Sequence, residues 1–117
     1  MASSKNQKIR IGVVGVGRGL SMGSRKDTGL ELVALCDTWE ERLLAAGQSL
    51  GVRTYADYEA FLDHDMDAVI LANYFHEHAP FAIRALEAGK HVMSETAACH
   101  TLGEGVALIE AVEKSGL

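Results

Sequence analysis

The sequence predicts an α/β domain built on a doubly wound parallel sheet, and three observations support that fold class. Short apolar runs alternate with segments of helical pattern along the chain. A glycine cluster, Gly12-Val-Val-Gly15-Val-Gly17-Arg-Gly19, directly follows the first run, and Asp37 closes the second. Strands separated by helices imply right-handed crossovers, which cover both faces of a parallel sheet with helices. Together these features predict a Rossmann fold.

Apolar runs that do not alternate with polar residues are typical of strands buried on both faces. Such runs predict strands over residues 8–14, 30–36, 67–72 and 90–93, with a short fifth strand near 52–55. A complete doubly wound sheet has about six strands. The sequence therefore predicts a truncated sheet over residues 8–117, about half to two-thirds of the full fold, as in a fragment of a longer protein.

Two segments have the spacing of a capping box, in which a threonine hydroxyl and a glutamate satisfy early backbone N–H groups reciprocally. Thr38-Trp-Glu-Glu41 predicts a helix that runs to about Leu50, and Thr101-Leu-Gly-Glu104 predicts one that ends near Gly116. Both helices have a glycine directly after their expected end, where a left-handed residue commonly terminates a helix.

Two further helices are predicted between these. One covers residues 57–63, and the other covers 81–88, with Pro80 in a position that a first helical turn tolerates and Gly89 at its end. Residues 20–29 contain few good helix formers, so the first helix of the domain is expected to be short or irregular.

Composition excludes several classes of partner. The net charge is -5 and basic residues form no run, which argues against nucleic acid. The apolar stretches are far shorter than a membrane span, and the polar N-terminus has no signal-peptide core. We therefore expect a cytoplasmic protein with a disordered tail over residues 1–7. Cys36 and Cys99 are expected to be unpaired thiols in such a compartment.

The glycine cluster has the chemistry that a dinucleotide pyrophosphate requires. Close approach of the backbone to a phosphate needs residues without a Cβ, and Gly15-x-Gly17 provides them directly after a strand. The third glycine of a G-x-G-x-x-G motif would fall at position 20, which is Leu20, whereas Gly19 comes one residue early. The match is therefore imperfect.

Asp37 strengthens this interpretation because it lies 22 residues after Gly15. An acid about 20 residues after the glycine turn holds the adenosine ribose in dinucleotide-binding domains. A carboxylate there also repels a 2′-phosphate, which favours NAD over NADP, although Arg18 could serve either cofactor. Trp39 follows closely and could either pack near the adenine or shield the core. The structural alternative is that the glycines only make a tight turn and that Asp37 caps a helix.

The most specific stretch is His78-Ala-Pro-Phe-Ala-Ile-Arg-Ala-Leu-Glu-Ala-Gly-Lys-His-Val-Met-Ser-Glu95. It resembles the signature H-A-x-x-A-I-x-A-x-x-A-G-K-H-V-x-x-E-K-P of the Gfo/Idh/MocA oxidoreductases, and the resemblance covers residues 8 to about 116. It implies an NAD- or NADP-dependent enzyme that oxidises sugars, polyols or related molecules. In that family the substrate site lies mostly in a C-terminal domain that also mediates oligomerisation, so the resemblance implies that this chain is the N-terminal domain only.

Carried over by position, the resemblance implies how each half of the cofactor is held. The glycine turn would meet the pyrophosphate, and Asp37 would hold the adenosine ribose. Residues 73–78 would line the nicotinamide side of the cleft, and Glu95 would lie near the nicotinamide ribose. The predicted cofactor-binding residues are Gly15, Val16, Gly17, Arg18, Asp37, Asn73, His78 and Glu95.

Thr96 departs from the family pattern, because it stands where the signature has a lysine that helps proton transfer at the substrate hydroxyl. A threonine hydroxyl cannot act as a general base near neutral pH. The catalytic residue is therefore unassigned: either another group does this chemistry or the reaction differs. Asn73-Tyr-Phe-His also stands where the family usually has Thr-Pro-Asn and a variable residue. A non-catalytic, stand-alone nucleotide-binding module is the alternative, and turnover by this chain alone is not expected.

Other candidate sites are weaker. His76 and His78, with Glu77 between them, could suggest a metal site, but histidines two apart rarely share a helical face, so none is predicted. Cys99 beside His100 is interpreted as a loop thiol rather than an activated one. A sheet that lacks its last strands exposes an edge and apolar side chains, so we expect a homo-oligomer.

Overall fold

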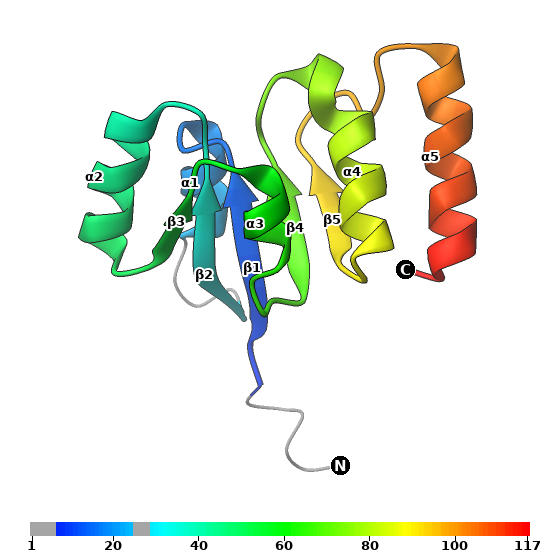
Figure 1. Ribbon diagram of the computed structural model, residues 1–117. Helices are drawn as coiled ribbons and strands as arrows, with labels where there is room; N and C mark the ends of the chain where they lie inside the picture. Colours follow the sequence, from blue (N-terminus) through cyan, green and yellow to red (C-terminus); the bar gives the residue numbers. More distant parts are fainter. Residues whose placement is uncertain (1–6, 25–28) are drawn as a thin grey trace.

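The computed structural model describes residues 7–24 and 29–117, and within them it contains one sheet of five parallel strands (Figure 1). The strands are β1 (Ile9–Val14), β2 (Leu30–Cys36), β3 (Arg53–Tyr55), β4 (Ala68–Leu71) and β5 (His91–Ser94). Their spatial order is β3-β2-β1-β4-β5. β2 and β3 thus lie on one side of β1, and β4 and β5 lie on the other, as in a Rossmann sheet. The predicted fold class is confirmed.

Helices cover both faces of this sheet (Figure 1). They are α1 (Arg18–Gly23), α2 (Glu40–Leu50), α3 (Tyr58–Leu62), α4 (His78–Glu87) and α5 (Leu102–Ser115), with a 3-10 turn η2 (Phe75–Glu77) before α4. The first two pack on one face, and α3 and α4 pack on the other. Helix α5 lies beside α4 at the outer end of the sheet. The expected short first helix is found, since α1 has six residues.

Each face of the sheet carries its own apolar layer. Phe61 and Val69 belong to the layer under α3 and α4, whereas Val13, Leu35 and Leu43 belong to the layer under α1 and α2. All five are buried. Burying a side chain of this kind stabilises the fold by about 1.5–3 kcal/mol. The central strands are therefore held from both sides, and their carboxyl ends meet at one well-defined edge.

The two predicted capping boxes have different outcomes. At Thr101 the box is present, because Glu104 N–H donates to the threonine hydroxyl at 3.1 Å and the Glu104 carboxylate accepts from Thr101 N–H. At Thr38 the prediction is wrong, because α2 begins at Glu40 after Trp39, with no side-chain cap. The nearby carboxylate of Asp37 accepts from Trp39 N–H instead. Such a local side-chain turn competes with a cap for the same backbone.

The remaining boundaries are close to the predicted ones. Helix α4 begins at His78, three residues earlier than expected, so that Pro80 lies in its first turn, where a missing N–H costs no helical bond. Asp57 caps α3 by accepting from Ala60 N–H at 3.1 Å. The tail predicted over residues 1–7 lies, apart from Gln7, outside the described residues. No helix within 7–24 and 29–117 is long and apolar enough to cross a bilayer.

Candidate dinucleotide-binding site

The turn after β1 requires glycine at Gly15. Its φ is +98°, and a Cβ there would lie 2.6 Å from the carbonyl oxygen of Ala72 at the end of β4. On the other side, Gly15 N–H donates to the carbonyl oxygen of Cys36 at 2.9 Å. The turn is therefore fixed against both neighbouring strands, at the point where the strand order reverses and ligands bind in such sheets.

Gly17 and Gly19 have different roles in the same turn. A Cβ on Gly17 would meet nothing within 4 Å, and this residue lines a cavity. The lack of a side chain at Gly17 therefore leaves space for a ligand, and packing within the protein does not require it. A Cβ on Gly19 would lie 2.6 Å from Val13 Cγ1, so Gly19 allows α1 to pack closely on β1. Gly19 thus allows the close packing of helix on strand that the third glycine of G-x-G-x-x-G provides, one position early.

Asp37 connects the end of β2 to the glycine turn. One carboxylate oxygen accepts from Val16 N–H and the other from Trp39 N–H, both at 2.9 Å. Each oxygen of a carboxylate can accept a second hydrogen bond, so both can still receive a hydroxyl. Asp37 therefore shapes the turn and also presents acceptors to the cavity that it lines.

A cavity of about 500 Å³ opens beside these groups at the carboxyl ends of β1, β2 and β4. Four predicted residues line it, namely Gly15, Gly17, Asp37 and Asn73. The walls also include residues that the glycine motif did not indicate: Thr38, Trp39, Arg42, Ala56, Tyr58, Tyr74, Glu77 and Phe81. They follow β2, β3 and β4 or lie in the first turns of α2, α3 and α4, so the fold, rather than the glycine motif, places them here.

Trp39 stands at the mouth of this cavity. Its side chain is 60% exposed, and the guanidinium of Arg42 lies 5.5 Å from the centre of its ring. An exposed tryptophan with a cation against its ring is a preformed aromatic wall. The sequence leaves two roles open for Trp39, packing near an adenine or shielding the core, and the exposure of its side chain favours the first.

Asn73 offers an unused acceptor in the cavity wall. Within the described part of the chain its Oδ1 is buried and has no hydrogen-bond partner, while its Nδ2 donates to Glu77 Oε1 at 3.4 Å. A buried polar atom without a partner costs free energy. A ligand that brings an N–H or O–H donor to this position would satisfy it, which suits an amide or ribose hydroxyl of a dinucleotide.

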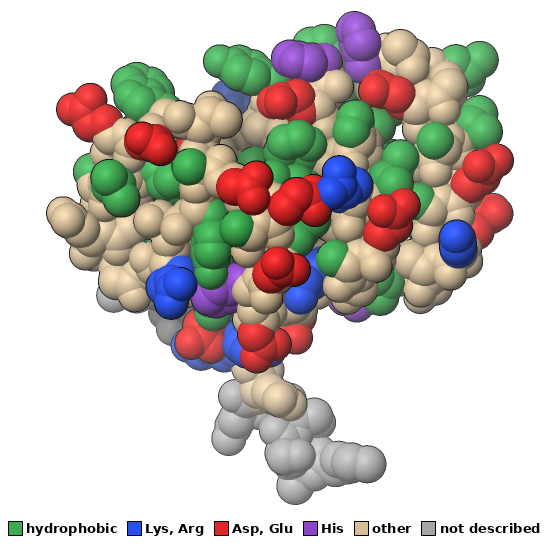
Figure 2. Space-filling model, in the orientation of Figure 1, with side chains coloured by type: hydrophobic (Ala, Val, Ile, Leu, Met, Phe, Trp, Pro, Cys, Tyr) green, Lys and Arg blue, Asp and Glu red, His purple; other side chains and the backbone are tan. Residues whose placement is uncertain are grey.

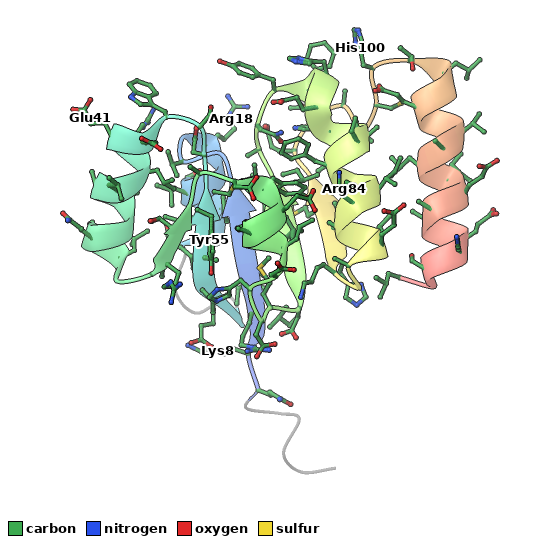
Figure 3. The ribbon with its side chains drawn as sticks, viewed as in Figure 1. Lys8, Arg18, Glu41, Tyr55, Arg84 and His100 are labelled. Carbon is green, nitrogen blue, oxygen red and sulfur yellow. The ribbon has the colours of Figure 1, made fainter. Side chains whose placement is uncertain are left out.

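Arg18 and Glu95 contact each other across the carboxyl edge of the sheet. Arg18 Nη1 lies 3.0 Å from Glu95 Oε1, and this ion pair connects the start of α1 to the residue after β5. Figure 3 shows Arg18 at that edge, close to the end of the central strands. Neither side chain lines the cavity itself. Val16 is buried and contributes to the site through its backbone.

His78 is not placed in the cavity. It is 0% exposed, and both ring nitrogens face backbone carbonyl oxygens. Figure 2 shows histidine side chains of other positions at the upper edge above α4, beside hydrophobic ones. Within residues 7–24 and 29–117, no three His, Cys, Asp or Glu side chains gather in a way that could hold a metal ion.

The cavity floor holds neutral groups. Burial raises the pKa of the Cys36 thiol to about 12, with the nearby charge of Asp37 adding to the shift. The thiol therefore stays protonated near neutral pH and cannot serve as a nucleophile. Burial also raises the pKa of Tyr58, whose hydroxyl donates to the carbonyl oxygen of Phe81 at 2.7 Å. Both groups act here as packing surface.

Thr96, which replaces the family lysine, has an unusual backbone. Its φ is +67°, and it is a β-branched residue in the left-handed region. We expect Thr96→Gly to raise the free energy of unfolding by about 1 kcal/mol, because glycine adopts this conformation without the steric cost. Urea denaturation checks this. Thr96→Ala keeps a Cβ and is the matched control, so an equal gain in both variants would contradict the explanation.

The parallel sheet, the glycine turn at its centre and the acid after β2 define this chain as a dinucleotide-binding Rossmann domain. A family model described as "Oxidoreductase family, NAD-binding Rossmann fold" (GFO_IDH_MocA) matches residues 9–117. The chain belongs to this family, and the resemblance seen in its sequence is confirmed. This description names NAD, which is the cofactor that Asp37 favours.

Individual relatives support the same assignment. The chain is 34% identical to glycosyl hydrolase family 109 protein 1 of Bacteroides fragilis, over 98% of this chain and 28% of the relative. It is 32% identical to inositol 2-dehydrogenase of Salmonella typhimurium, over 92% of this chain and 34% of the relative. It thus spans about a third or less of the curated relatives that it matches.

A solved structure has the same fold. The WlbA dehydrogenase of Bordetella pertussis, determined in complex with NADH and UDP-GlcNAcA, superposes with a TM-score of 0.86 and 32% identity. The match covers 95% of this chain and 35% of that one. The similarity is therefore to one domain of a larger dehydrogenase.

Proposed function

We propose that this chain binds NAD in the cavity between its glycine turn and Asp37, as the cofactor domain of an oxidoreductase that acts on a sugar- or polyol-like alcohol. The observation that carries the proposal is the Asp37 carboxylate, which is bonded to the turn at Val16 and lines the cavity beside Gly15 and Gly17. Bound NAD supplies a hydride acceptor, whereas the residues around the cavity hold and orient it.

The adenosine half fits the end of the cavity beside β2. Asp37 accepts from the ribose hydroxyls, and Trp39 offers an aromatic wall to the adenine. The glycine turn lets the pyrophosphate approach the backbone over Gly17, where a Cβ would meet no atom within 4 Å beyond its two chain neighbours. Arg18, one residue further on, adds a positive charge for a phosphate.

The nicotinamide half fits the end beside β4 and β5. Asn73 Oδ1 accepts a donor there, since it has no partner among the described residues. The Glu95 carboxylate accepts from the hydroxyls of the second ribose once Arg18 no longer pairs with that carboxylate. The backbone of Glu95 is fixed directly after β5, because Glu95 N–H donates to the carbonyl oxygen of Leu71 at 2.9 Å. Sugar- and polyol-dehydrogenase relatives support the substrate class.

Calorimetry with both nicotinamide cofactors tests the proposal on the chain as it exists. We expect measurable heat with NAD and weaker binding of NADP, because the Asp37 carboxylate repels a 2′-phosphate. An absence of heat with either cofactor, from protein shown to be folded, would contradict NAD binding. A preference for NADP would instead contradict the role given to Asp37.

Thr96 favours a second candidate activity. A threonine cannot take a proton from an alcohol near neutral pH, and one relative that covers 98% of this chain is described as a glycosyl hydrolase. The second candidate is therefore cleavage of a glycosidic bond. Assays of a longer protein carrying this domain would show NAD reduction in the first case and release of p-nitrophenol from a p-nitrophenyl glycoside in the second. If the protein forms neither product, a non-catalytic binding module is favoured.

We further propose a cytoplasmic homo-oligomer without a nucleic-acid partner. The net charge of -5 disfavours binding to phosphate backbones. Both cysteines are free, which suits a reducing compartment. Leu102, Val106 and Ile109 are exposed along α5, and an exposed apolar stripe of this kind favours association.

A further inference from the structure

Four aromatic side chains gather at the carboxyl edge of the sheet, beside the start of α4. Tyr74, Phe75 and His76 come from the segment after β4, and His100 comes from the loop after β5. The ring centres of Tyr74 and His76 are 5.8 Å apart with nearly parallel planes, and those of Phe75 and His100 are 5.4 Å apart. Figure 3 shows His100 at this edge, and Figure 2 shows histidine and hydrophobic side chains together there. We call these four residues the aromatic surface.

The aromatic surface is exposed, although its backbone is held in place. The side chain of Tyr74 is 74% exposed and that of Phe75 is 49% exposed. In the turn that carries them, Glu77 N–H donates to the carbonyl oxygen of Tyr74 at 2.9 Å. In the other loop, His100 N–H donates to Glu104 Oε1 at 2.9 Å. Rings on a fixed backbone lose little conformational entropy when a ligand covers them, so the surface is preorganised for binding.

The aromatic surface is continuous with the cavity. Tyr74 belongs to the surface and also lines the cavity. Asn73, directly before it, carries the buried Oδ1 that has no partner among the described residues and that we assign to the nicotinamide half. A ligand that rests on Tyr74 therefore lies next to the end of the cavity proposed for the nicotinamide.

The chemistry of the aromatic surface indicates the kind of ligand. The exposed apolar side chains along α5 are aliphatic, whereas this surface combines flat rings with imidazole nitrogens and a phenol hydroxyl. The face of an aromatic ring is electron-rich, so it attracts the slightly positive C–H groups that share one face of a sugar or cyclitol ring. The imidazoles and the phenol can exchange hydrogen bonds with hydroxyls around that ring. An open-chain polyol has no such flat C–H face.

We propose that the aromatic surface is this domain's part of the substrate site, and that it binds a sugar or cyclitol in its ring form with the C–H face against Tyr74 and Phe75. The proposal rests on the proposed function for the class of ligand, and it deepens that function by selecting cyclic over open-chain substrates. Tyr74 and Phe75 stand where the family pattern has proline and asparagine, so the surface sets a specificity of this chain.

NMR titration of the isotopically labelled chain, with and without NAD, tests the proposal. The matched probes are myo-inositol and sorbitol, which have equal numbers of carbons and hydroxyls although only the first is a ring. Methyl β-D-glucopyranoside is a second cyclic probe. In titrations to about 100 mM, we expect the ring signals of Tyr74, Phe75 and His100 to move with a cyclic probe at concentrations at least roughly tenfold lower than with sorbitol.

Nuclear Overhauser effects locate the bound probe. We expect them between the C–H protons of the cyclic probe and the ring protons of Tyr74. Ring signals that do not move with either cyclic probe, or that move equally with sorbitol, would overturn the proposal.

Substitution shows whether the ring of Tyr74 carries the binding. Tyr74→Ala should weaken binding of the cyclic probe at least roughly tenfold, whereas Tyr74→Phe keeps the ring and should retain most of the affinity. The control is Leu102→Ala, which removes a side chain that is 87% exposed on α5 and should bind as wild type does. Wild-type affinity in folded Tyr74→Ala would overturn the role given to Tyr74. If Tyr74→Ala does not fold, the Overhauser effects in the wild-type chain decide.

The titrations separate failure of this inference from failure of the proposed function. If the chain binds no NAD, the proposed function fails, while the titration without NAD still tests the aromatic surface, because its rings are exposed in the free chain. If NAD binds and the cyclic probes leave the ring signals unchanged, only this inference fails. Ring signals that move with protein concentration but not with the probes would assign the surface to contact between copies of the chain, which also counts against the inference.

Discussion

Gly15→Ala should lower the free energy of unfolding by about 2–5 kcal/mol and remove NAD binding. Alanine is strained at a φ of +98°, which costs roughly 1–2 kcal/mol. Its Cβ would also lie 2.6 Å from the carbonyl oxygen of Ala72, and overpacking costs typically about 1–3 kcal/mol. Because that atom belongs to the backbone at the end of β4, a side-chain rotation cannot relieve the contact. Urea denaturation measures the first effect and calorimetry the second.

Gly17→Ala is the matched variant that separates the fold from the ligand. A Cβ there meets no atom within 4 Å, so we expect stability to stay within about 0.5 kcal/mol of wild type. The same methyl group would occupy the space over which the pyrophosphate approaches, so NAD affinity should fall at least roughly tenfold. Equal loss of stability in both variants, or wild-type NAD binding by Gly17→Ala, would show that the turn does not have these two roles.

Asp37→Ala should weaken NAD binding roughly a hundredfold while affecting NADP much less. The variant loses the acceptors for Val16 and Trp39 N–H and also the acceptors proposed for the ribose hydroxyls. Hydrogen bonds to a charged group contribute about 1.5–3 kcal/mol each, and tenfold in affinity corresponds to about 1.4 kcal/mol. Removing the negative charge also removes its repulsion of a 2′-phosphate. Calorimetric titration with each cofactor gives the ratio of the two affinities.

Asp57→Ala is the control for that substitution. Asp57 also accepts a backbone N–H, from Ala60, and caps α3, but it does not line the cavity. Its loss should cost about 1 kcal/mol of stability and leave both cofactor affinities unchanged. If Asp57→Ala weakened NAD binding as much as Asp37→Ala, the effect would reflect general destabilisation rather than a lost ligand contact.

The parts of the fold that depend on burial could be predicted from the sequence. Uninterrupted apolar runs indicated the strands, and parallel strands place their carboxyl ends at one edge. For that reason Gly15 and Asp37, which follow β1 and β2, were expected to meet, and the hydrogen bond from Val16 to Asp37 joins them. The residue type could not show that a Cβ would clash with the backbone at Gly15 but would face the ligand space at Gly17. This distinction depends on where the end of β4 lies in the folded protein.

The parts that depend on competition between nearby polar groups could not be predicted. The Thr38 capping box fits the pattern, but the carboxylate of Asp37 takes the backbone N–H of Trp39 instead. Tyr58 and Phe81 line the cavity because α3 and α4 pack on the same face of the sheet, and no local motif indicates this. A family signature identified His78, but its spacing could not show that the ring points into the protein interior.

A titration of the isotopically labelled chain with NAD, followed by amide NMR spectra, tests the central claim most directly. If NAD binds between the glycine turn and Asp37, the amide signals of Gly15, Gly17, Trp39 and Asn73 should move together, with a single dissociation constant. Signals from α5, which lies at the outer end of the sheet, should stay in place. Folded protein whose spectrum does not change, or changes only away from this edge of the sheet, would contradict the claim.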